Sequence, residues 1–121
     1  MINYLKYYIY FWENYEMIRI WAKTMQENKI KNDIIYETIE NYSRETFFDH
    51  LSEICYLMNI PTPVLLDTHY HSYENFNNIK FLASDFIESI DFDYLMIQNP
   101  NLQIFQVAKR QFLHLINPLF L

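Results

Sequence analysis

The sequence predicts a small α+β fold, in which an antiparallel sheet, made of a hairpin and a later strand, is packed by one main amphipathic helix. Three observations predict it: a helical apolar period over residues 43–59, alternating periods over residues 17–23 and 30–38, and another alternating stretch at residues 91–98. We expect helical extensions at both termini. A mostly α fold is the alternative, because the apolar positions of residues 4–25 also fit one helical stripe.

The length and composition fit one domain. The chain has 121 residues, of which 51% are hydrophobic and 19% aromatic, enough for one compact core but not for two ordinary domains. We therefore expect a single domain over residues 1–121. Its core spans residues 17–98, between an N-terminal extension (1–16) and a C-terminal extension (99–121).

The main helix has a clear start, face and end. Ser43 is a natural N-cap, and Glu45 places a negative charge near the positive end of the helix dipole. Asn59 tolerates the left-handed conformation that ends helices, and Pro61 prevents continuation. The apolar positions share one helical face: Phe47, Leu51, Ile54, Cys55 and Met58.

The hairpin strands alternate between apolar and polar positions. Ile18, Ile20 and Ala22 fall on one side of the first strand. Arg19, Trp21 and Lys23 fall on the other side, which is therefore a candidate binding face. Residues 26–29 form a polar turn before the second strand.

The chain after the main helix is predicted in shorter pieces. Two prolines impose an extended and covered path on residues 60–66. Asp67 or Thr68 then caps a short helix that ends at Asn77 and Asn78. Further predictions are a helical turn at residues 83–87, the strand at 91–98, and a terminal helix beyond Asn99 and Pro100.

Glycine is absent from the chain. Phosphate-binding loops of the G-x-x-x-x-G-K-[ST] and G-x-G-x-x-G types, and the G-x-S-x-G nucleophile elbow, all need it for positive φ angles or close backbone approach. These nucleotide and nucleophile motifs are therefore excluded. Turns must use asparagine instead, as at Asn28, Asn59, Asn77 and Asn78.

The net charge and the cysteine content restrict the possible binding partners and the cellular compartment of the protein. A net charge of −6 argues against direct nucleic-acid binding, which needs a stripe of Lys and Arg to displace counterions. The single Cys55 cannot form an internal disulfide, and we expect a buried, inert thiol. Residues 1–16 resemble neither a signal peptide nor a membrane span, so we expect a cytoplasmic protein and no membrane partner. The alternative, ranked last, is an aromatic N-terminal arm over residues 1–16 that touches a membrane.

Several short motifs resemble a set of short bacterial proteins of uncharacterised function. The motifs are RIWAK at 19–23, EICY at 53–56, PVLL at 63–66, and DFIE at 85–88 followed by DFDYL at 91–95. The resemblance covers residues 17–98, and in such proteins the chain begins at the position of Met17 and stops soon after the last strand. It implies an independent small domain and attaches no activity to it.

One segment is a candidate metal site. An apolar run followed by Asp67, His69 and His71 is similar to the first-strand metal motif of amidohydrolase-type barrels, where alternate strand positions place both imidazoles on one metal. His50 is a possible additional ligand of this divalent transition ion. A barrel of that class needs about 250 residues, and the alternative interpretation is a capped, solvated helix start.

A second candidate is acidic. Glu45, Asp49 and Glu53 recur at i, i+4 and i+8 on the outward face of the main helix, where they could receive a basic partner. A solvated helix face is the alternative interpretation. Asp85, Glu88, Asp91 and Asp93 crowd a later segment, but their spacing does not match an EF-hand loop.

The sequence therefore favours a non-catalytic protein–protein interaction module without a cofactor. The partner is an unknown protein or a second copy of the chain. The alternative is a metal-binding protein or metal-dependent hydrolase that uses residues 67–71.

Overall fold

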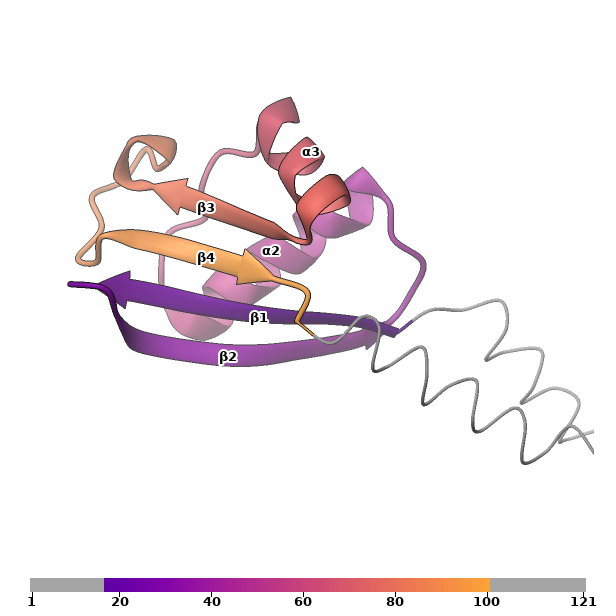
Figure 1. Ribbon diagram of the computed structural model, residues 1–121, viewed down its shortest axis with the longest axis horizontal. Coiled ribbons are helices and arrows are strands. Elements are labelled where there is room, and N and C mark those ends of the chain that lie inside the picture. Colours follow the sequence, from indigo (N-terminus) through magenta and orange to yellow (C-terminus); the bar gives the residue numbers. More distant parts are fainter. Residues whose placement is uncertain (1–16, 101–121) are drawn as a thin grey trace, which may run out of the picture.

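The computed structural model describes residues 17–100, which form a four-stranded antiparallel sheet with two helices behind it (Figure 1). In chain order the elements are β1 (Met17–Gln26), β2 (Lys29–Ile39), α2 (Arg44–Met58), α3 (Asp67–Phe76), β3 (Asn78–Leu82), the 3₁₀ helix η1 (Ala83–Asp85) and β4 (Tyr94–Gln98). The strand order is β2-β1-β4-β3. The predicted α+β fold is confirmed, and the expectations for residues 1–16 and 101–121 lie outside the described residues.

The β1–β2 hairpin is longer than predicted. β1 continues to Gln26, and its turn contains only Glu27 and Asn28, which have φ angles of 53° and 62°. Positive φ at both positions matches the twist of a two-residue hairpin. Glu27 is an uncommon residue for this conformation, and its N–H donates to the Asp93 carboxylate at 2.8 Å. The helical alternative is wrong for residues 17–25.

Helix α2 confirms each predicted signal. The Ser43 hydroxyl accepts from the Thr46 N–H, and the Thr46 hydroxyl accepts from the Ser43 N–H, both at 3.1 Å. Asn59 is left-handed at the other end, with φ 57°. The predicted apolar face is buried, and His50 is buried with it. The cap and the apolar face thus fix where the helix starts and how it rotates against the sheet.

The chain between α2 and β3 differs from the prediction in two respects. Leu66, rather than Asp67 or Thr68, is the N-cap of α3, and its N–H donates to Nδ1 of His69 at 3.0 Å. The expected cover over residues 60–66 is incomplete: Pro63 is buried, whereas Val64 and Leu66 are exposed. Asn77 ends α3 in the left-handed conformation, as predicted.

The last part of the chain adds a strand that was not predicted. β3 begins at Asn78, directly after the end of α3, and pairs with β4 along its whole length. Of the predicted helical turn at 83–87 only η1 forms, and β4 begins at Tyr94 rather than at residue 91. The backbone bends before β4, where the Asp93 N–H donates to the Met25 carbonyl at 2.8 Å.

One face of the sheet carries the core. Ile20 of β1, Phe81 of β3, and Leu95 and Ile97 of β4 are completely buried beneath α2 and α3. The ring of Phe47 on α2 packs 4.5 Å from the ring of Tyr73 on α3, which joins the two helices. Burial of such side chains contributes about 1.5–3 kcal/mol each, so most of the stability comes from this covered face.

The opposite face, which we call the outer face, is crossed by no helix or strand among residues 17–100 (Figure 1). Alternation and register place these residues on it: Met17, Arg19, Trp21, Lys23 and Met25 of β1, Asp33, Ile35, Glu37 and Ile39 of β2, Asn78, Lys80 and Leu82 of β3, and Tyr94, Met96 and Gln98 of β4. Each of them is at least partly exposed.

Candidate functional site

The predicted metal ligands lie on a helix and point to different partners. Asp67 lies 3.4 Å from the Arg44 guanidinium. His69 accepts from the Leu66 N–H through Nδ1, and its Nε2 lies 3.6 Å from the Asp85 carboxylate. His71 is exposed. Successive helical residues are turned by about 100°, so His69 and His71 project to opposite sides of α3, unlike alternate residues on a strand.

Within residues 17–100, no three His, Cys, Asp or Glu side chains lie close enough together to hold a metal ion. His50, the possible additional ligand, lies on α2, and its Nε2 is 2.7 Å from the Glu40 carboxylate. Its Nδ1 is buried and has no hydrogen-bond partner among residues 17–100, while its ring lies 5.6 Å from that of Tyr36. The structure thus brings His50 to Glu40, and metal binding by Asp67, His69 and His71 stays a prediction.

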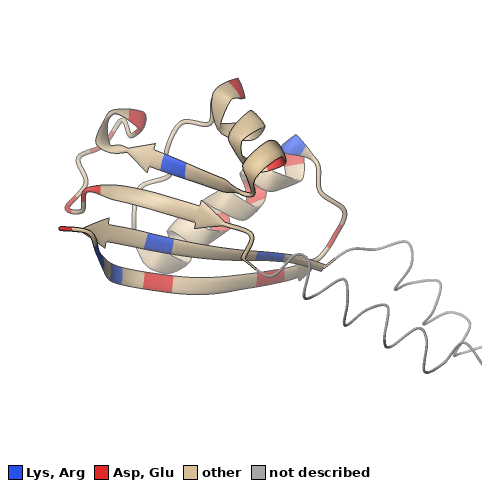
Figure 2. Ribbon diagram, in the orientation of Figure 1, with Lys and Arg blue, Asp and Glu red and all other residues tan. Residues whose placement is uncertain are grey.

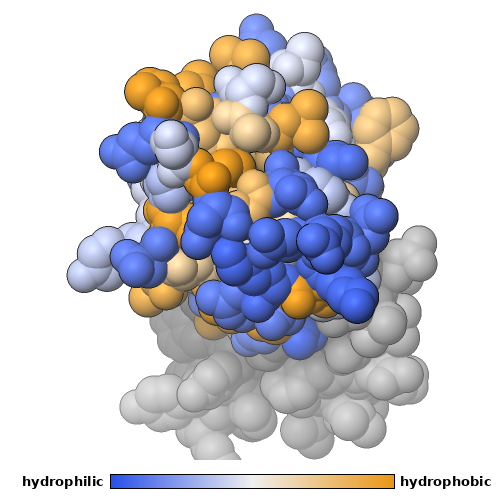
Figure 3. Space-filling view, turned by 90° about the vertical axis from the view of Figure 1, so that its left-hand side faces the viewer, coloured by the Kyte–Doolittle hydropathy of each residue, from blue (hydrophilic) through white to orange (hydrophobic). Residues whose placement is uncertain are grey.

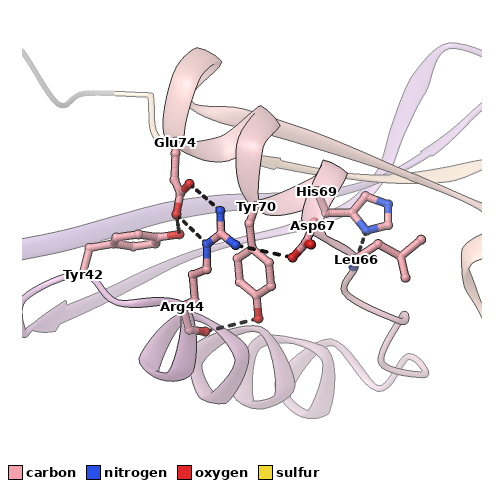
Figure 4. A network of polar contacts seen from close by, with 7 residues as sticks. All are labelled: Tyr42, Arg44, Leu66, Asp67, His69, Tyr70 and Glu74. Atoms are coloured by element: carbon pink, nitrogen blue, oxygen red, sulfur yellow. Dashed lines mark hydrogen bonds and ion pairs between the residues drawn. The ribbon is translucent and has the colours of Figure 1, made fainter.

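A polar network centred on Arg44 joins α2 to α3 (Figure 4). The Arg44 guanidinium donates to both Glu74 carboxylate oxygens at 3.0 and 3.1 Å. The Tyr42 hydroxyl donates to the same carboxylate at 2.8 Å, and the Tyr70 hydroxyl donates to the Arg44 carbonyl at 3.2 Å. We call this network the clasp; its residues are Tyr42, Arg44, Asp67, Tyr70 and Glu74. Sequence reasoning did not predict that Arg44 and Asp67 interact.

The clasp shifts two pKa values. The hydrogen bonds from Arg44 and then Tyr42 lower the pKa of Glu74 to about 2, because both stabilise the charged carboxylate. Partial burial, followed by the hydrogen bond to Glu74, raises the pKa of Tyr42 well above its usual range. Glu74 is thus charged and Tyr42 neutral over the whole physiological range.

The predicted acidic residues have the predicted exposure. Glu45, Asp49 and Glu53 all lie on the exposed side of α2. Glu53 accepts a hydrogen bond of 2.5 Å from the Tyr36 hydroxyl. Burial, followed by this bond, raises the pKa of Tyr36 to about 12. Glu53 therefore fastens α2 to β2, and recognition of a basic partner by the three carboxylates stays a prediction.

Cys55 is buried against the sheet, as predicted. Burial raises the pKa of its thiol to about 12, because the thiolate is the form that loses hydration. The thiolate is the reactive species, so Cys55 is a core residue rather than a nucleophile.

A cavity of about 210 Å³ lies between the start of β1, the end of α3 and the connections before α2 and after β4. It is lined by Met17, Ile18, Tyr42, Tyr73, Glu74, Asn77 and Asn99. The carboxylate in this lining, Glu74, already accepts from Arg44 and Tyr42. Tyr42 and Glu74 of the cavity lining therefore already belong to the clasp.

The outer face has ordered polar and aromatic contacts. Trp21 donates from Nε1 to the Asp33 carboxylate at 2.9 Å, and Arg19 forms an ion pair with Glu37 at 3.3 Å. Lys23 lies 3.9 Å from the centre of the Trp21 ring. The alternating pattern of β1 identified Arg19, Trp21 and Lys23 as a face, and this placement is confirmed.

The other half of the outer face was missed by sequence reasoning. Lys80 lies 4.2 Å from the centre of the Tyr94 ring, and Met96 stands opposite both Lys23 and Lys80 in the ladder. The signal that could have found them is the alternation of Ile79 and Phe81 with polar residues in β3, which is only five residues long.

Hydrophobic side chains also gather at the end of the sheet that carries η1. Seen from that end, hydrophobic residues lie among hydrophilic ones in the upper part of the surface, whereas hydrophilic residues predominate at the centre and right of the lower part (Figure 3). Two exposed aliphatic side chains near η1 are those of Val64 and Ile87. The Val64 N–H donates to the carbonyl of Asp85, the last residue of η1, at 2.8 Å.

Comparison with protein families, curated proteins and solved structures found no match to the chain. The resemblance to short bacterial proteins therefore stays a prediction. Among the described helices none is long and apolar enough to cross a membrane.

Proposed function

We propose that this chain is a non-catalytic protein–protein interaction module that binds its partner through the outer face of the sheet. The observation that carries the proposal is the exposure of every outer-face residue on all four strands, including the apolar Trp21, Ile35 and Met96. Tryptophan, tyrosine, methionine and arginine are enriched where proteins bind one another, and this face presents all four types.

The fixed geometry of the face supports the proposal. The Trp21 indole is held by Asp33, and the Arg19 guanidinium by Glu37. A side chain that is already held in place loses less conformational entropy when a partner binds. Trp21 and Ile35 stand directly opposite each other in the ladder, so their apolar side chains are neighbours on the outer face.

Site-specific photocrosslinking tests the proposal. The photoreactive amino acid p-benzoylphenylalanine replaces Ile35 on the outer face in one full-length variant and Ile87 near η1 in another. Both isoleucines are exposed, 47% and 90% respectively. We expect irradiation in the source cells to produce a discrete protein adduct from position 35 and not from position 87.

The crosslinked protein is then identified, purified and titrated against the full chain. Ile35→Glu should weaken binding by about tenfold or more, because it places a charge in an apolar contact, whereas Ile87→Glu should change binding less than about twofold. An adduct from position 87 alone, no adduct from either position, or equal sensitivity to the two substitutions would contradict the proposal.

A further inference from the structure

The charges of the described chain are divided between its layers (Figure 2). The cations of the strands are Arg19, Lys23, Lys29, Lys31 and Lys80, whereas their acids are Asp33 and Glu37. Among residues 17–100, Arg44 is the one Lys or Arg outside the strands, and the remaining acids lie on the helices and connections. The strands therefore carry a net positive charge, and the helices and connections carry a net negative charge.

The two strand acids are already occupied by groups of the outer face. Asp33 accepts from Trp21 and Glu37 pairs with Arg19. Within residues 17–100, Lys23 and Lys80 form no ion pair, and each ammonium lies over an aromatic ring instead. These two lysines are consequently the positive groups of the outer face that are ready to take an anionic partner.

Lys23 and Lys80 form one row with a methionine between them. Both stand opposite Met96 in the ladder, so their Cα atoms are separated by two strand spacings, about 10 Å. On one face of an extended polypeptide, residues two and four positions apart are separated by about 7 and 13 Å. Flexible lysine side chains span this difference, so acidic residues on both sides of an apolar residue match the row.

We propose that the row Lys23, Met96 and Lys80 binds an acidic segment of a partner polypeptide. Two partner carboxylates pair with the two lysines, and the apolar residue between them packs on Met96 beside Trp21 and Tyr94. The inference rests on the proposed function and specifies its partner. The acidic helices and the net charge of −6 repel a long polyanion such as nucleic acid, whose binding needs many phosphate contacts. A short acidic segment needs only two ion pairs, and Lys23 and Lys80 supply both.

Fluorescence anisotropy with the full chain tests this inference. The probe is a fluorescein-labelled ten-residue peptide, Glu-Ser-Val-Ser-Glu-Ser-Val-Ser-Glu-Ser, in which Glu and Val share one face of the extended chain. The matched probe has Gln in place of every Glu. At low salt, the Glu peptide should bind about fivefold to tenfold more tightly than the Gln peptide, as two partly exposed ion pairs allow. The preference should decline as salt is added.

Two double variants with the same change in net charge locate the site. Lys23→Gln with Lys80→Gln should abolish the preference for the Glu peptide. Lys29→Gln with Lys31→Gln should retain it within about twofold, because these lysines lie at the start of β2, where Lys31 pairs with Asp91 at 3.2 Å. Circular dichroism confirms that both variants are folded.

Three results would overturn the inference: equal binding of the Glu and Gln peptides, equal losses in the two double variants, or tighter binding of labelled ten-nucleotide oligothymidylate through Lys23 and Lys80. The proposed function has a separate outcome. A partner that crosslinks at position 35 but binds the Lys23 and Lys80 variant normally would leave the interaction module standing without the acidic segment.

Discussion

The two faces of the sheet use adjacent residues for different purposes. On β4, Leu95 and Ile97 are completely buried under the helices, whereas Tyr94 and Met96 lie half-exposed on the outer face. Both helices belong to the one connection that leaves the sheet after β2 and returns to it at β3, and they lie on the same side of the sheet (Figure 1). The covered face therefore holds the fold together, and the outer face is available for recognition at little cost to stability.

The largest expected effect comes from truncating neighbours on β4. Leu95→Ala should lower the free energy of unfolding by about 2–5 kcal/mol, since it leaves a cavity in the core. Met96→Ala, one residue further along on the outer face, should cost about 1 kcal/mol or less. Urea unfolding followed by circular dichroism measures both values. Similar losses for the two variants would mean that the outer face is also packed.

A smaller effect is expected at the start of the covering layer. Ser43→Ala removes the cap of α2 and should cost about 1 kcal/mol, measured by the same urea titration. Ser52→Ala is the matched control. The Ser52 hydroxyl donates to the Phe48 carbonyl at 3.0 Å inside α2, where alanine is the better helix former. A loss at Ser52 as large as that at Ser43 would argue against a specific capping contribution.

The smallest effect concerns the clasp between α2 and α3, and it depends on pH. The pKa of Glu74 is lowered from 4.5 to about 2, so its contribution to stability is present above the unfolded value and is lost as the pH falls through the folded value. Wild type should therefore melt at a higher temperature than Glu74→Gln at pH 6, and the difference should disappear as the pH approaches 2.

Arg44→Gln provides the control for the clasp. Arg44 is the main cause of the low pKa of Glu74, so the effect of Glu74→Gln at pH 6 should shrink in the Arg44→Gln background. Melting curves of the two single variants and the double variant form a complete cycle. Additive changes in melting temperature would show that the two side chains act independently.

Sequence patterns predicted the elements whose signals are local. The sequence correctly predicted three features of α2: the N-cap Ser43, the left-handed Asn59 and the apolar face. It also correctly predicted the alternation in β1. β3 was missed because five residues directly after a helix carry too little periodicity. The position of a short strand is decided by its partner in the sheet, and Ile79 faces Ile97 from far away in the sequence.

The candidate sites were harder to predict because they depend on contacts between distant residues. The sequence placed Asp67, His69 and His71 in a metal motif that requires a strand, but His69 caps the helix start and Asp67 faces Arg44. The β1 side of the outer face was predicted, whereas Lys80 and Tyr94 joined it only through the pairing of β3 with β4.

The position of β1 and β4 at the centre of the sheet has a consequence for synthesis of the protein. The hairpin closes through a two-residue turn and forms within microseconds. β1 then lacks its second neighbour until Gln98, which stands opposite Trp21, has been translated. Residues 40–98 are translated in this interval, which takes on the order of 3 to 12 s at the usual pace of translation. The nascent hairpin therefore spends seconds with an unpaired edge on its central strand, and this is the period in which it is most exposed to pairing with the wrong strand.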